Sequence, residues 1–319
     1  MSMQKAVQHP ILITGATSGL GRRVALELAR NGIPVIVAGR RQDAVLQVCA
    51  SISRLGARAT PLVADLASLS TVRSALDDLG NVPLGGIVAN AGINTMQDAR
   101  SADGYEITFA VNVLSHQLLI CRLAGQLVAG ARIVVLSSGV HCPDNKLARR
   151  AGIPVPQWAP PHSLAIPDGT PPGSQGANGR QRYSTSKLAN VLQARGMQKR
   201  LRRAGKDIDV FALDPGLMVD TELARELPLP LRAAFRLVGR VMTPFVDNMR
   251  LSTTTARHVV SLLAAREWRG RGFSYVDGDQ VMSPSADALR DDLMEELWSG
   301  CAKLIALRSD ETCLPLDSP

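Results

Sequence analysis

Aromatic residues are scarce in this chain of 319 residues: Phe, Trp and Tyr together make up 3% of it. The apolar fraction is nevertheless 45%, so a hydrophobic core has to be built from Ala, Val, Leu and Ile. That apolar content excludes disorder of the whole chain. The length fits one large α/β domain or two small domains, with room for a sizeable core.

Cysteine is also rare, and its placement excludes two common uses. The cysteines are odd in number, lie far apart and form no C-x-x-C motif. We therefore expect reduced thiols, with neither a disulfide framework nor a zinc site, and no other metal site is predicted. They are Cys49, Cys121, Cys142, Cys301 and Cys313.

Long hydrophobic runs are absent too. Residues 1–10 are polar and unlike a secretory signal, and no run approaches the roughly 18 apolar residues of a membrane-spanning helix. We expect a cytoplasmic protein, and attachment to a membrane surface through an amphipathic segment stays open. The net charge of +8 comes from arginines spread over many segments. Because nucleic-acid-binding proteins concentrate such charge and interleave it with aromatics, no nucleic-acid partner is expected.

Short apolar runs alternate with helical patterns. The runs predict strands at residues 11–13, 34–38, 60–63, 85–89, 133–136, 208–213 and 272–276. Helices are predicted at 19–30, 43–55, 69–79, 105–128, 183–203, 251–265 and 286–305. Because the strand runs are continuously apolar, they indicate a parallel sheet covered on both faces. We predict an α/β fold with a doubly wound parallel sheet, in a single domain over residues 1–319, with its ligand crevice at the carboxyl ends of the strands.

Two segments depart from this alternation. Residues 140–182 are crowded with Pro and Gly, which excludes a regular helix or a central strand. We expect a long surface insertion, either a functional lid or a segment without a specific role. Residues 217–247 are irregular but amphipathic. They predict a substrate lid, while a membrane or oligomer contact, or core packing against the sheet, stays open.

A glycine-rich turn joins the first predicted strand to the first helix. It runs Thr14-Gly15-Ala16-Thr17-Ser18-Gly19-Leu20-Gly21. Gly15 allows a tight turn, Gly19 lets a diphosphate approach the backbone, and Gly21 lets the helix pack close to the sheet. The helix start then presents unpaired N–H groups to the phosphates. In this context the turn predicts a dinucleotide site.

The second predicted strand ends in Arg40 and Arg41, without the carboxylate that NAD-binding folds use for the ribose hydroxyls. A guanidinium donates two parallel hydrogen bonds and therefore suits a 2′-phosphate. Arg22 at the helix start is placed to add to this charge. The alternative is that these arginines are only solvated surface groups. We predict NADP(H) as the cofactor.

The glycine pattern resembles the T-G-x-x-x-G-x-G of the classical short-chain dehydrogenase/reductase family, and further motifs of that family follow in order over residues 10–216. They are Asp65-Leu66, Asn90-Ala91-Gly92, Asn112, Ser137-Ser138, Tyr183 and Lys187 as Y-x-x-x-K, and Pro215-Gly216. The resemblance implies a Rossmann fold and a catalytic set of Asn112, Ser138, Tyr183 and Lys187. Together with Arg40 and Arg41, the implied cofactor contacts are Thr14, Gly15, Thr17, Ser18, Gly19, Leu20, Gly21, Asp65, Leu66, Asn90, Ala91, Gly92, Tyr183, Lys187, Pro215, Gly216 and Thr221.

Tyr183 and Lys187 lie one helical turn apart and share a helix face. A phenol is a poor base at neutral pH, but a neighbouring ammonium and an oxidised nicotinamide lower its pKa. Tyr183 is therefore predicted to exchange a proton with the substrate oxygen. Ser138 is predicted to donate a hydrogen bond to the same oxygen. The resemblance makes Asn112 the residue that holds a water, which extends a proton relay from Lys187.

A closer resemblance is to the branch of retinol dehydrogenases and protochlorophyllide reductases. Residues 137–141, 183–190 and 283–286 carry it, with Trp298 further on. We assign His141 no catalytic duty, because Tyr183 already fills the acid–base role.

We expect an NADP(H)-dependent oxidoreductase that reduces a ketone or aldehyde of a hydrophobic small molecule, or oxidises the alcohol. An isomerase or epimerase on the same fold and a non-enzymatic NADP-binding regulator stay open, although the intact set of four residues argues against a regulator. Relatives in the family form dimers or tetramers, so the resemblance is compatible with a homodimer or homotetramer. No transmembrane segment is expected.

Overall fold

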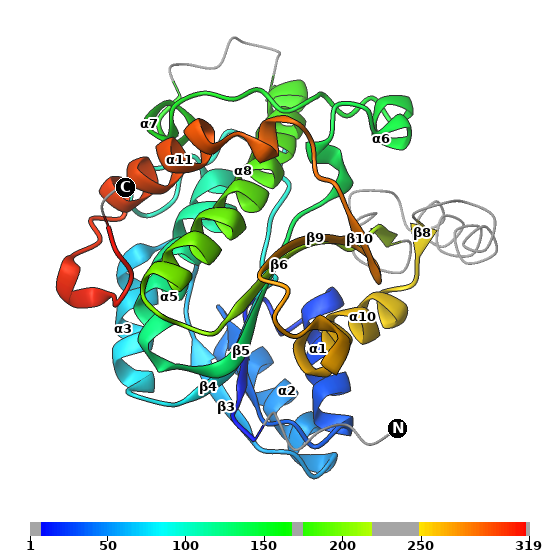
Figure 1. Cartoon of the computed structure of the whole chain (residues 1–319), viewed down its shortest axis with the longest axis vertical. Coiled ribbons are helices and arrows are strands. Elements are labelled where there is room, and N and C mark those ends of the chain that lie inside the picture. The colour runs from blue at the N-terminus through cyan, green and yellow to red at the C-terminus, as the bar shows by residue number, and fades with distance from the viewer. Residues whose placement is uncertain (1–7, 168–174, 219–248, 317–319) are drawn as a thin grey trace.

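A computed structural model describes residues 8–167, 175–218 and 249–316 of the chain. Its centre is an 8-stranded sheet in the order β10-β9-β6-β5-β4-β1-β2-β3, with helices on both faces (Figure 1). The strands pair in parallel except β10, which runs antiparallel to β9. The doubly wound sheet predicted from the apolar runs is confirmed. Its strand order reverses between β1 and β4, the position at which such sheets bind ligands.

Most central strands are buried along their whole length, which explains why their sequences do not alternate. Every residue of β1 and β6 is buried, whereas the edge strand β3 is largely exposed. The strands are β1 (Ile11–Ile13), β2 (Val35–Gly39), β3 (Ala59–Val63), β4 (Leu84–Ala89), β5 (Leu127–Leu136), β6 (Asp209–Asp214), β9 (Phe273–Asp277) and β10 (Gln280–Met282).

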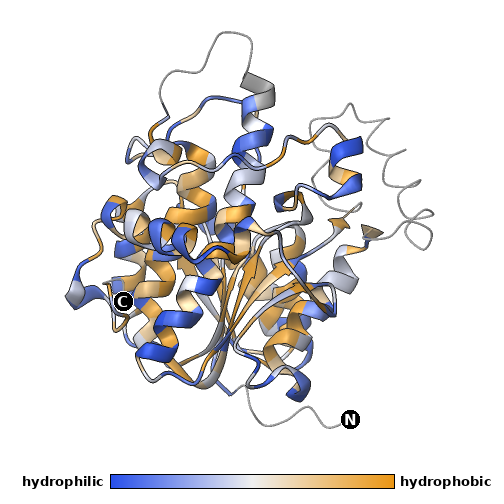
Figure 2. Cartoon of the chain, turned by 45° about the horizontal axis from the view of Figure 1, so that its top comes forward, coloured by the Kyte–Doolittle hydropathy of each residue, from blue (hydrophilic) through white to orange (hydrophobic). Residues whose placement is uncertain are grey.

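The helices form two layers, and each layer shares an aliphatic core with one face of the sheet. One layer contains α1 (Gly19–Arg30), α2 (Gln42–Arg54) and α10 (Ser252–Ala264). The other contains α3 (Leu69–Leu79), α5 (Ser115–Leu123), α8 (Gln175–Arg203) and α11 (Asp291–Leu304). Figure 2 shows apolar residues on the sheet and on the helix faces turned toward it. The core therefore forms with few aromatic rings, as the composition requires.

The prediction of one regular helix over residues 105–128 is wrong in two respects: the segment is not a regular α-helix, and its last residues belong to a strand. It is a succession of α4 (Ile107–Phe109), a π-helical turn (Ala110–Leu114), α5 and a 3-10 turn (Ala124–Gln126). In the π-helical turn, the N–H of Ser115 donates to the carbonyl of Ala110, five residues back. β5 then begins at Leu127. Such π-bulges occur frequently at functional sites.

The stretch Ile107–Gln126 is long and apolar enough to cross a membrane by length and composition alone. Within the protein, 89% of its most apolar window is buried. The core helix of a compact protein passes the same test.

Residues 140–182 contain helices, contrary to the prediction of an irregular insertion. They include α6 (Lys146–Arg150) and α7 (Pro161–Ala165), and α8 begins at Gln175 rather than at residue 183. Proline stands in the first turn of α7, where a helix tolerates it. Gly179 lies against a neighbouring loop, since a Cβ there would be 2.9 Å from Cα of Met96. This close packing explains why glycine occurs at this position of the helix although its helix propensity is low.

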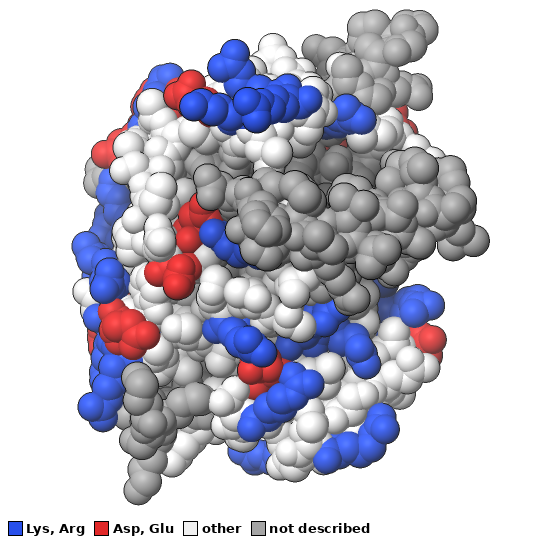
Figure 3. Space-filling view, turned by 90° about the vertical axis from the view of Figure 1, so that its right-hand side faces the viewer, with Lys and Arg blue, Asp and Glu red and all other residues white. Residues whose placement is uncertain are grey.

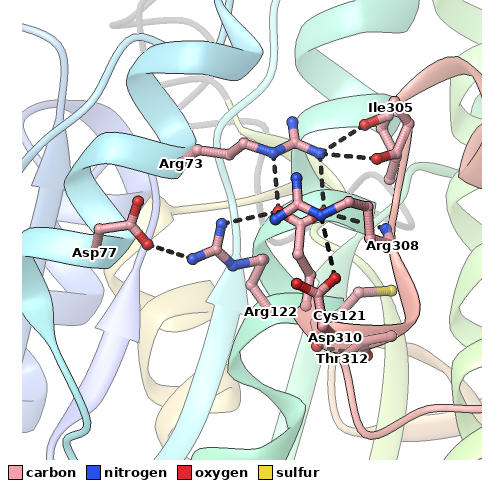
Figure 4. A network of polar contacts seen from close by, with 10 residues as sticks. Arg73, Asp77, Cys121, Arg122, Ile305, Arg308, Asp310 and Thr312 are labelled. Carbon is pink, nitrogen blue, oxygen red and sulfur yellow. Dashed lines mark hydrogen bonds and ion pairs between the residues drawn. The ribbon is translucent and has the colours of Figure 1, made fainter.

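The C-terminal residues are attached by a network of charges (Figure 4). The side chain of Glu311 is 3% exposed. Its Oε1 accepts hydrogen bonds from Arg73 of α3 at 3.0 Å and from Arg122 of α5 at 3.1 Å. The backbone N–H of Arg308 donates to its Oε2 at 3.1 Å. The network thus joins the 3-10 turn Ser309–Glu311 to two helices distant in sequence.

Candidate functional site

The carboxyl ends of β1, β4, β5 and β6 meet at one edge of the sheet. Thr14 follows β1, Asn90 follows β4, Ser138 lies two residues past β5, and Asp214 ends β6. Beyond Gly216, β7 (Leu217–Met218) pairs in parallel with β8 (Met249–Arg250). Thr221, together with the predicted lid from residue 219 onward, lies outside the described residues.

The glycine turn has the backbone that its sequence predicts. Gly15 and Gly19 have φ values of 64° and 51°, in the left-handed region that favours glycine. A Cβ on Gly21 would clash with the carbonyl oxygen of Gly15 and would lie 2.5 Å from Nδ2 of Asn90, so glycine is required for α1 to pack on the turn and the end of β4. No described residue lies within 4 Å of a Cβ position on Gly19, and Ser18 makes no side-chain cap on α1. The first turn of α1 therefore presents N–H groups suited to a diphosphate.

Hydrogen bonds between Thr14 and Asn90 connect the glycine turn to the end of β4. Thr14 Oγ1 accepts hydrogen bonds from the backbone N–H groups of Asn90 and Ala91, each at 3.0 Å. Asn90 Nδ2 donates in return to the carbonyl of Thr14 at 2.8 Å. Thr14 is 1% exposed, so it shapes the turn through the backbone that it supports.

Arg40 and Arg41 are exposed at the end of β2. The backbone N–H of Ala64 donates to the carbonyl of Gly39 at 3.0 Å, which places Asp65 beside them at the end of β3. Arg41 Nε lies 4.0 Å from Asp43 Oδ1, with the two side chains 69% and 66% exposed. Such a pair is weak, because water screens it.

The basic side chains elsewhere are dispersed, as the sequence suggests. On the face drawn in Figure 3, Lys and Arg form separate groups with Asp and Glu among them. Over the described surface of that face there is no continuous basic stripe of the kind that tracks a nucleic acid.

Lys187 is buried on α8 and points toward the end of β5. Its Nζ donates to the carbonyl of Leu136 at 2.8 Å and to Asn190 Oδ1 at 3.3 Å. Nζ lies 5.5 Å from the ring centroid of Tyr183, and a Cβ on Gly92 would lie 3.7 Å from it. Burial lowers the pKa of Lys187 to about 8, opposed by the carboxylate of Asp214. The ammonium therefore keeps its charge at neutral pH.

The pKa of Tyr183 moves opposite to the direction expected from its neighbour Lys187. Burial raises it to about 12, and the carboxylate of Asp214 adds to the rise. Desolvation and a nearby negative charge both disfavour the phenolate, and together they set the direction of the shift. Tyr183 therefore holds its proton at neutral pH.

The two neighbours of Ser138 in the chain place it between α8 and the end of β6. Ser137 Oγ donates to the carbonyl of Lys187 at 2.9 Å. A Cβ on Gly139 would lie 2.6 Å from Oδ2 of Asp214. The loop after β5 is thus held between the lysine of α8 and the end of β6.

His141 holds the backbone of Ser138. Its Nδ1 lies 2.8 Å from the carbonyl of Ser138, and its Nε2 accepts from the backbone N–H of Ser285 at 3.2 Å. A neutral ring with its proton on Nδ1 satisfies both bonds. Burial lowers the pKa of His141, which keeps the ring neutral. That His141 has no acid–base duty stays a prediction.

Asn112 lies in the π-helical turn, and its side chain is engaged by hydrogen bonds. Oδ1 accepts from the N–H of Ile93 at 2.8 Å, while Nδ2 donates to the carbonyl of Ile93 at 3.1 Å and to Ser186 Oγ at 3.0 Å. These bonds tie the segment after β4 to α8. The role of Asn112 in holding a relay water stays a prediction.

Two buried polar residues near this site were not predicted as site residues from the sequence. His116 contacts Thr14, and Asn190 contacts Lys187. His116 stands four positions after Asn112, and Asn190 three after Lys187. Such spacing places each on the same helix face as a predicted residue, which is the signal that identifies them.

Comparisons with known proteins agree with this arrangement. Residues 9–144 match the family model described as short chain dehydrogenase. The chain is 32% identical over 298 residues to polyprenol dehydrogenase of Mus musculus, covering 90% of this chain and 81% of that protein. It is 28% identical over 308 residues to retinol dehydrogenase 13 of Homo sapiens, covering 94% and 85%.

Solved structures share the fold. A short chain dehydrogenase from Burkholderia cenocepacia in complex with NADP superposes with a TM-score of 0.61 and 25% identity, covering 86% of this chain and 98% of that one. A putative uncharacterized protein from Mycobacterium paratuberculosis gives a TM-score of 0.70 at 24% identity, covering 96% of both. The chain therefore belongs to the short-chain dehydrogenase/reductase family, in its retinol-dehydrogenase-like branch.

Proposed function

We propose that this chain is an NADP(H)-dependent oxidoreductase that reduces a ketone or aldehyde of a hydrophobic small molecule, or oxidises the corresponding alcohol. One observation carries the proposal: the Lys187 ammonium, 5.5 Å from the ring centroid of Tyr183, lies beside Gly92, and the preceding residue Ala91 packs against Gly15 of the glycine turn. A proton donor thus stands beside a site suited to a dinucleotide.

The bound cofactor would supply the hydride that adds to the carbonyl carbon. In the proposed reaction Tyr183 gives its proton to the carbonyl oxygen, and Ser138 donates a hydrogen bond to the same oxygen. Lys187 supplies a positive charge that stabilises the tyrosinate left behind. Tyr183 is protonated at neutral pH, which is the state in which its phenol can give a proton to the carbonyl oxygen.

The residues at the turn fit a dinucleotide with a 2′-phosphate. The first turn of α1 is open, Gly19 leaves room for a phosphate, and the end of β2 offers two guanidinium groups in place of a carboxylate. The related structure from Burkholderia cenocepacia was solved in complex with NADP, which supports this assignment.

The names of the relatives support an apolar substrate. Polyprenol dehydrogenase and retinol dehydrogenase 13 are named for apolar alcohols. We propose a substrate of that chemical class, handled by a single domain in the cytoplasm, as a homodimer or homotetramer.

The proposal is tested by mixing the purified chain with NADPH or NADH and a panel of apolar ketones and aldehydes, and following nicotinamide absorbance. We expect NADPH to be consumed with at least one carbonyl class, with NADH a poorer donor. Loss of substrate without net consumption of NADPH would assign an isomerase or epimerase instead. Absence of NADPH binding would refute the proposal.

Arg40→Asp is expected to weaken NADPH binding by about 10- to 100-fold, because a hydrogen-bonded charge pair contributes roughly 1.5–3 kcal/mol. NADH binding, which lacks the 2′-phosphate, should change little. Fluorescence titration with both cofactors measures the difference. Arg54→Asp is the matched control, since Arg54 is exposed at the far end of α2, the helix that follows Arg40 and Arg41 in the chain. Equal losses for the two cofactors would contradict the assignment of Arg40.

A further inference from the structure

His116 is a buried side chain of α5 that the proposed reaction does not use. It is 1% exposed. Its Nε2 lies 2.9 Å from Oγ1 of Thr14, and its Nδ1 lies 3.2 Å from the carbonyl oxygen of Asn112. The ring therefore spans the distance between the glycine turn and the π-helical turn.

One tautomer satisfies both contacts. The carbonyl of Asn112 can only accept, so Nδ1 carries the proton and Nε2 is an acceptor. Thr14 Oγ1 already accepts from two backbone N–H groups, and its own proton is donated to Nε2. The other acceptor in reach of that proton, the carbonyl of Val88, is farther away at 3.4 Å. Burial lowers the pKa of His116 to about 4, assisted by the charge of Lys187 and opposed by the bond to Asn112.

The carbonyl of Asn112 has a second donor, Asn190. Asn190 Nδ2 donates to it at 2.7 Å, and Asn190 Oδ1 accepts from Lys187 Nζ at 3.3 Å. An amide has one donating and one accepting end, so the bond to Asn112 determines which end faces Lys187. An unbroken series of hydrogen bonds therefore connects the threonine of the glycine turn to the ammonium.

Resting on the function proposed above, we infer that His116 is a positioning residue, which couples the glycine turn that holds the dinucleotide to the orientation of the Lys187 ammonium. Lys187 has three N–H donors. The carbonyl of Leu136 and Asn190 Oδ1 take two of them. The direction of the third follows from the other two, and we expect it to serve Tyr183 or the bound cofactor.

The two ring nitrogens of His116 have separable duties. Nε2 holds the hydroxyl of Thr14 and, through it, the backbone at Asn90 that packs on the glycine turn. Nδ1 holds the carbonyl of Asn112 and, through Asn190, the ammonium. Loss of the first duty should appear as weaker cofactor binding, and loss of the second as slower turnover.

Three substitutions separate these duties. His116→Gln keeps an acceptor near Nε2 and loses the donor at Nδ1. We expect its NADPH dissociation constant to stay within about twofold of wild type, while kcat falls about tenfold, the equivalent of one hydrogen bond. His116→Asn keeps a short donor for Asn112 and loses the acceptor, so binding should weaken about tenfold with kcat largely kept. His116→Phe should lose both.

Gln117→Leu is the matched control. Gln117 is the next residue of α5 and is fully buried, but its amide bonds to the carbonyl of Trp298 and to Gln193, away from the site. It should lower thermal stability while leaving kcat and NADPH binding per folded molecule unchanged. If the His116 variants behave like Gln117→Leu, with stability lost and kinetics kept, the inference is overturned.

A double-mutant cycle of His116→Phe with Thr14→Val tests the contact without a substrate. Each change removes the same hydrogen bond. The effect of the double variant on the unfolding equilibrium constant should therefore be about tenfold smaller than the product of the two single effects. Multiplicative effects would exclude the coupling. Failure of wild type to bind NADPH would refute the proposed function but would leave this cycle to decide the contact.

Discussion

Replacing Tyr183 with Phe is expected to lower kcat for carbonyl reduction by roughly 10²- to 10⁴-fold, the usual contribution of a positioned general acid. The ring, and with it the packing on Lys187, is kept, so NADPH binding should stay close to wild type. The loss should appear in the hydride-transfer step, because the alkoxide that forms lacks the group that gives it a proton and keeps only the hydrogen bond from Ser138. Stopped-flow single turnover with NADPH and a carbonyl substrate measures it.

Tyr105→Phe is the control for this experiment. The phenol of Tyr105 donates to the carbonyl of Leu304, the last residue of α11, at 2.7 Å, and bonds to none of the site residues. The variant should lose stability of about 1 kcal/mol and keep its turnover. If Tyr183→Phe kept kcat within about threefold of wild type, the loss would be far smaller than removal of a general acid causes. Another group would then have to be the proton donor.

The second large effect concerns stability rather than turnover. Glu311→Gln is expected to lower the free energy of unfolding by about 3 kcal/mol, at the low end for breaking a buried ion pair because the two arginines are partly exposed. The variant leaves Arg73 and Arg122 facing each other without their shared carboxylate. Urea denaturation, with the slope of the transition as a check on two-state behaviour, measures the change.

The pH dependence of this network has a defined sign. Burial raises the pKa of Glu311, but hydrogen bonds from Arg73 and from the backbone of Arg308 bring it below its ordinary value. Because the folded pKa is depressed, the stabilisation is complete above the ordinary pKa of the group and is lost as the pH falls through the folded value. Glu311→Gln should therefore be less sensitive than wild type to acid below about pH 4.5.

Asp310→Asn is the neighbouring control for Glu311→Gln. Asp310 pairs with Arg308 at 3.1 Å, but the side chains are 72% and 64% exposed, and such pairs contribute less than about 1 kcal/mol. A loss of less than about 1 kcal/mol in both variants would show that Figure 4 draws a solvated surface cluster rather than an attachment of the turn Ser309–Glu311 to the helices.

Much of this fold follows from local pattern. The continuously apolar runs predicted the parallel strands because residues buried on both faces of a sheet have to be apolar throughout. The glycine turn was predicted in conformation as well as in place, since positive φ at Gly15 and Gly19 and the tight approach at Gly21 each require the absence of a side chain. Boundaries were less predictable: α8 starts at Gln175 rather than at residue 183, and Gly179 in that early part packs on another segment, a contact that no local pattern reports.

Sequence pattern thus identified the sheet, the turn and the identities of Tyr183, Lys187 and Ser138 as candidates. The electrostatic state of those candidates depends on folding. Tyr183 has a raised pKa because α8 is buried against the end of β6, with its carboxylate at Asp214. The partners of buried polar groups come from distant segments as well: His116 and Thr14 are 102 residues apart, and Arg73 and Glu311 are 238 apart. Burial forces each such group to find a partner, but which partner is in reach depends on how the chain has packed.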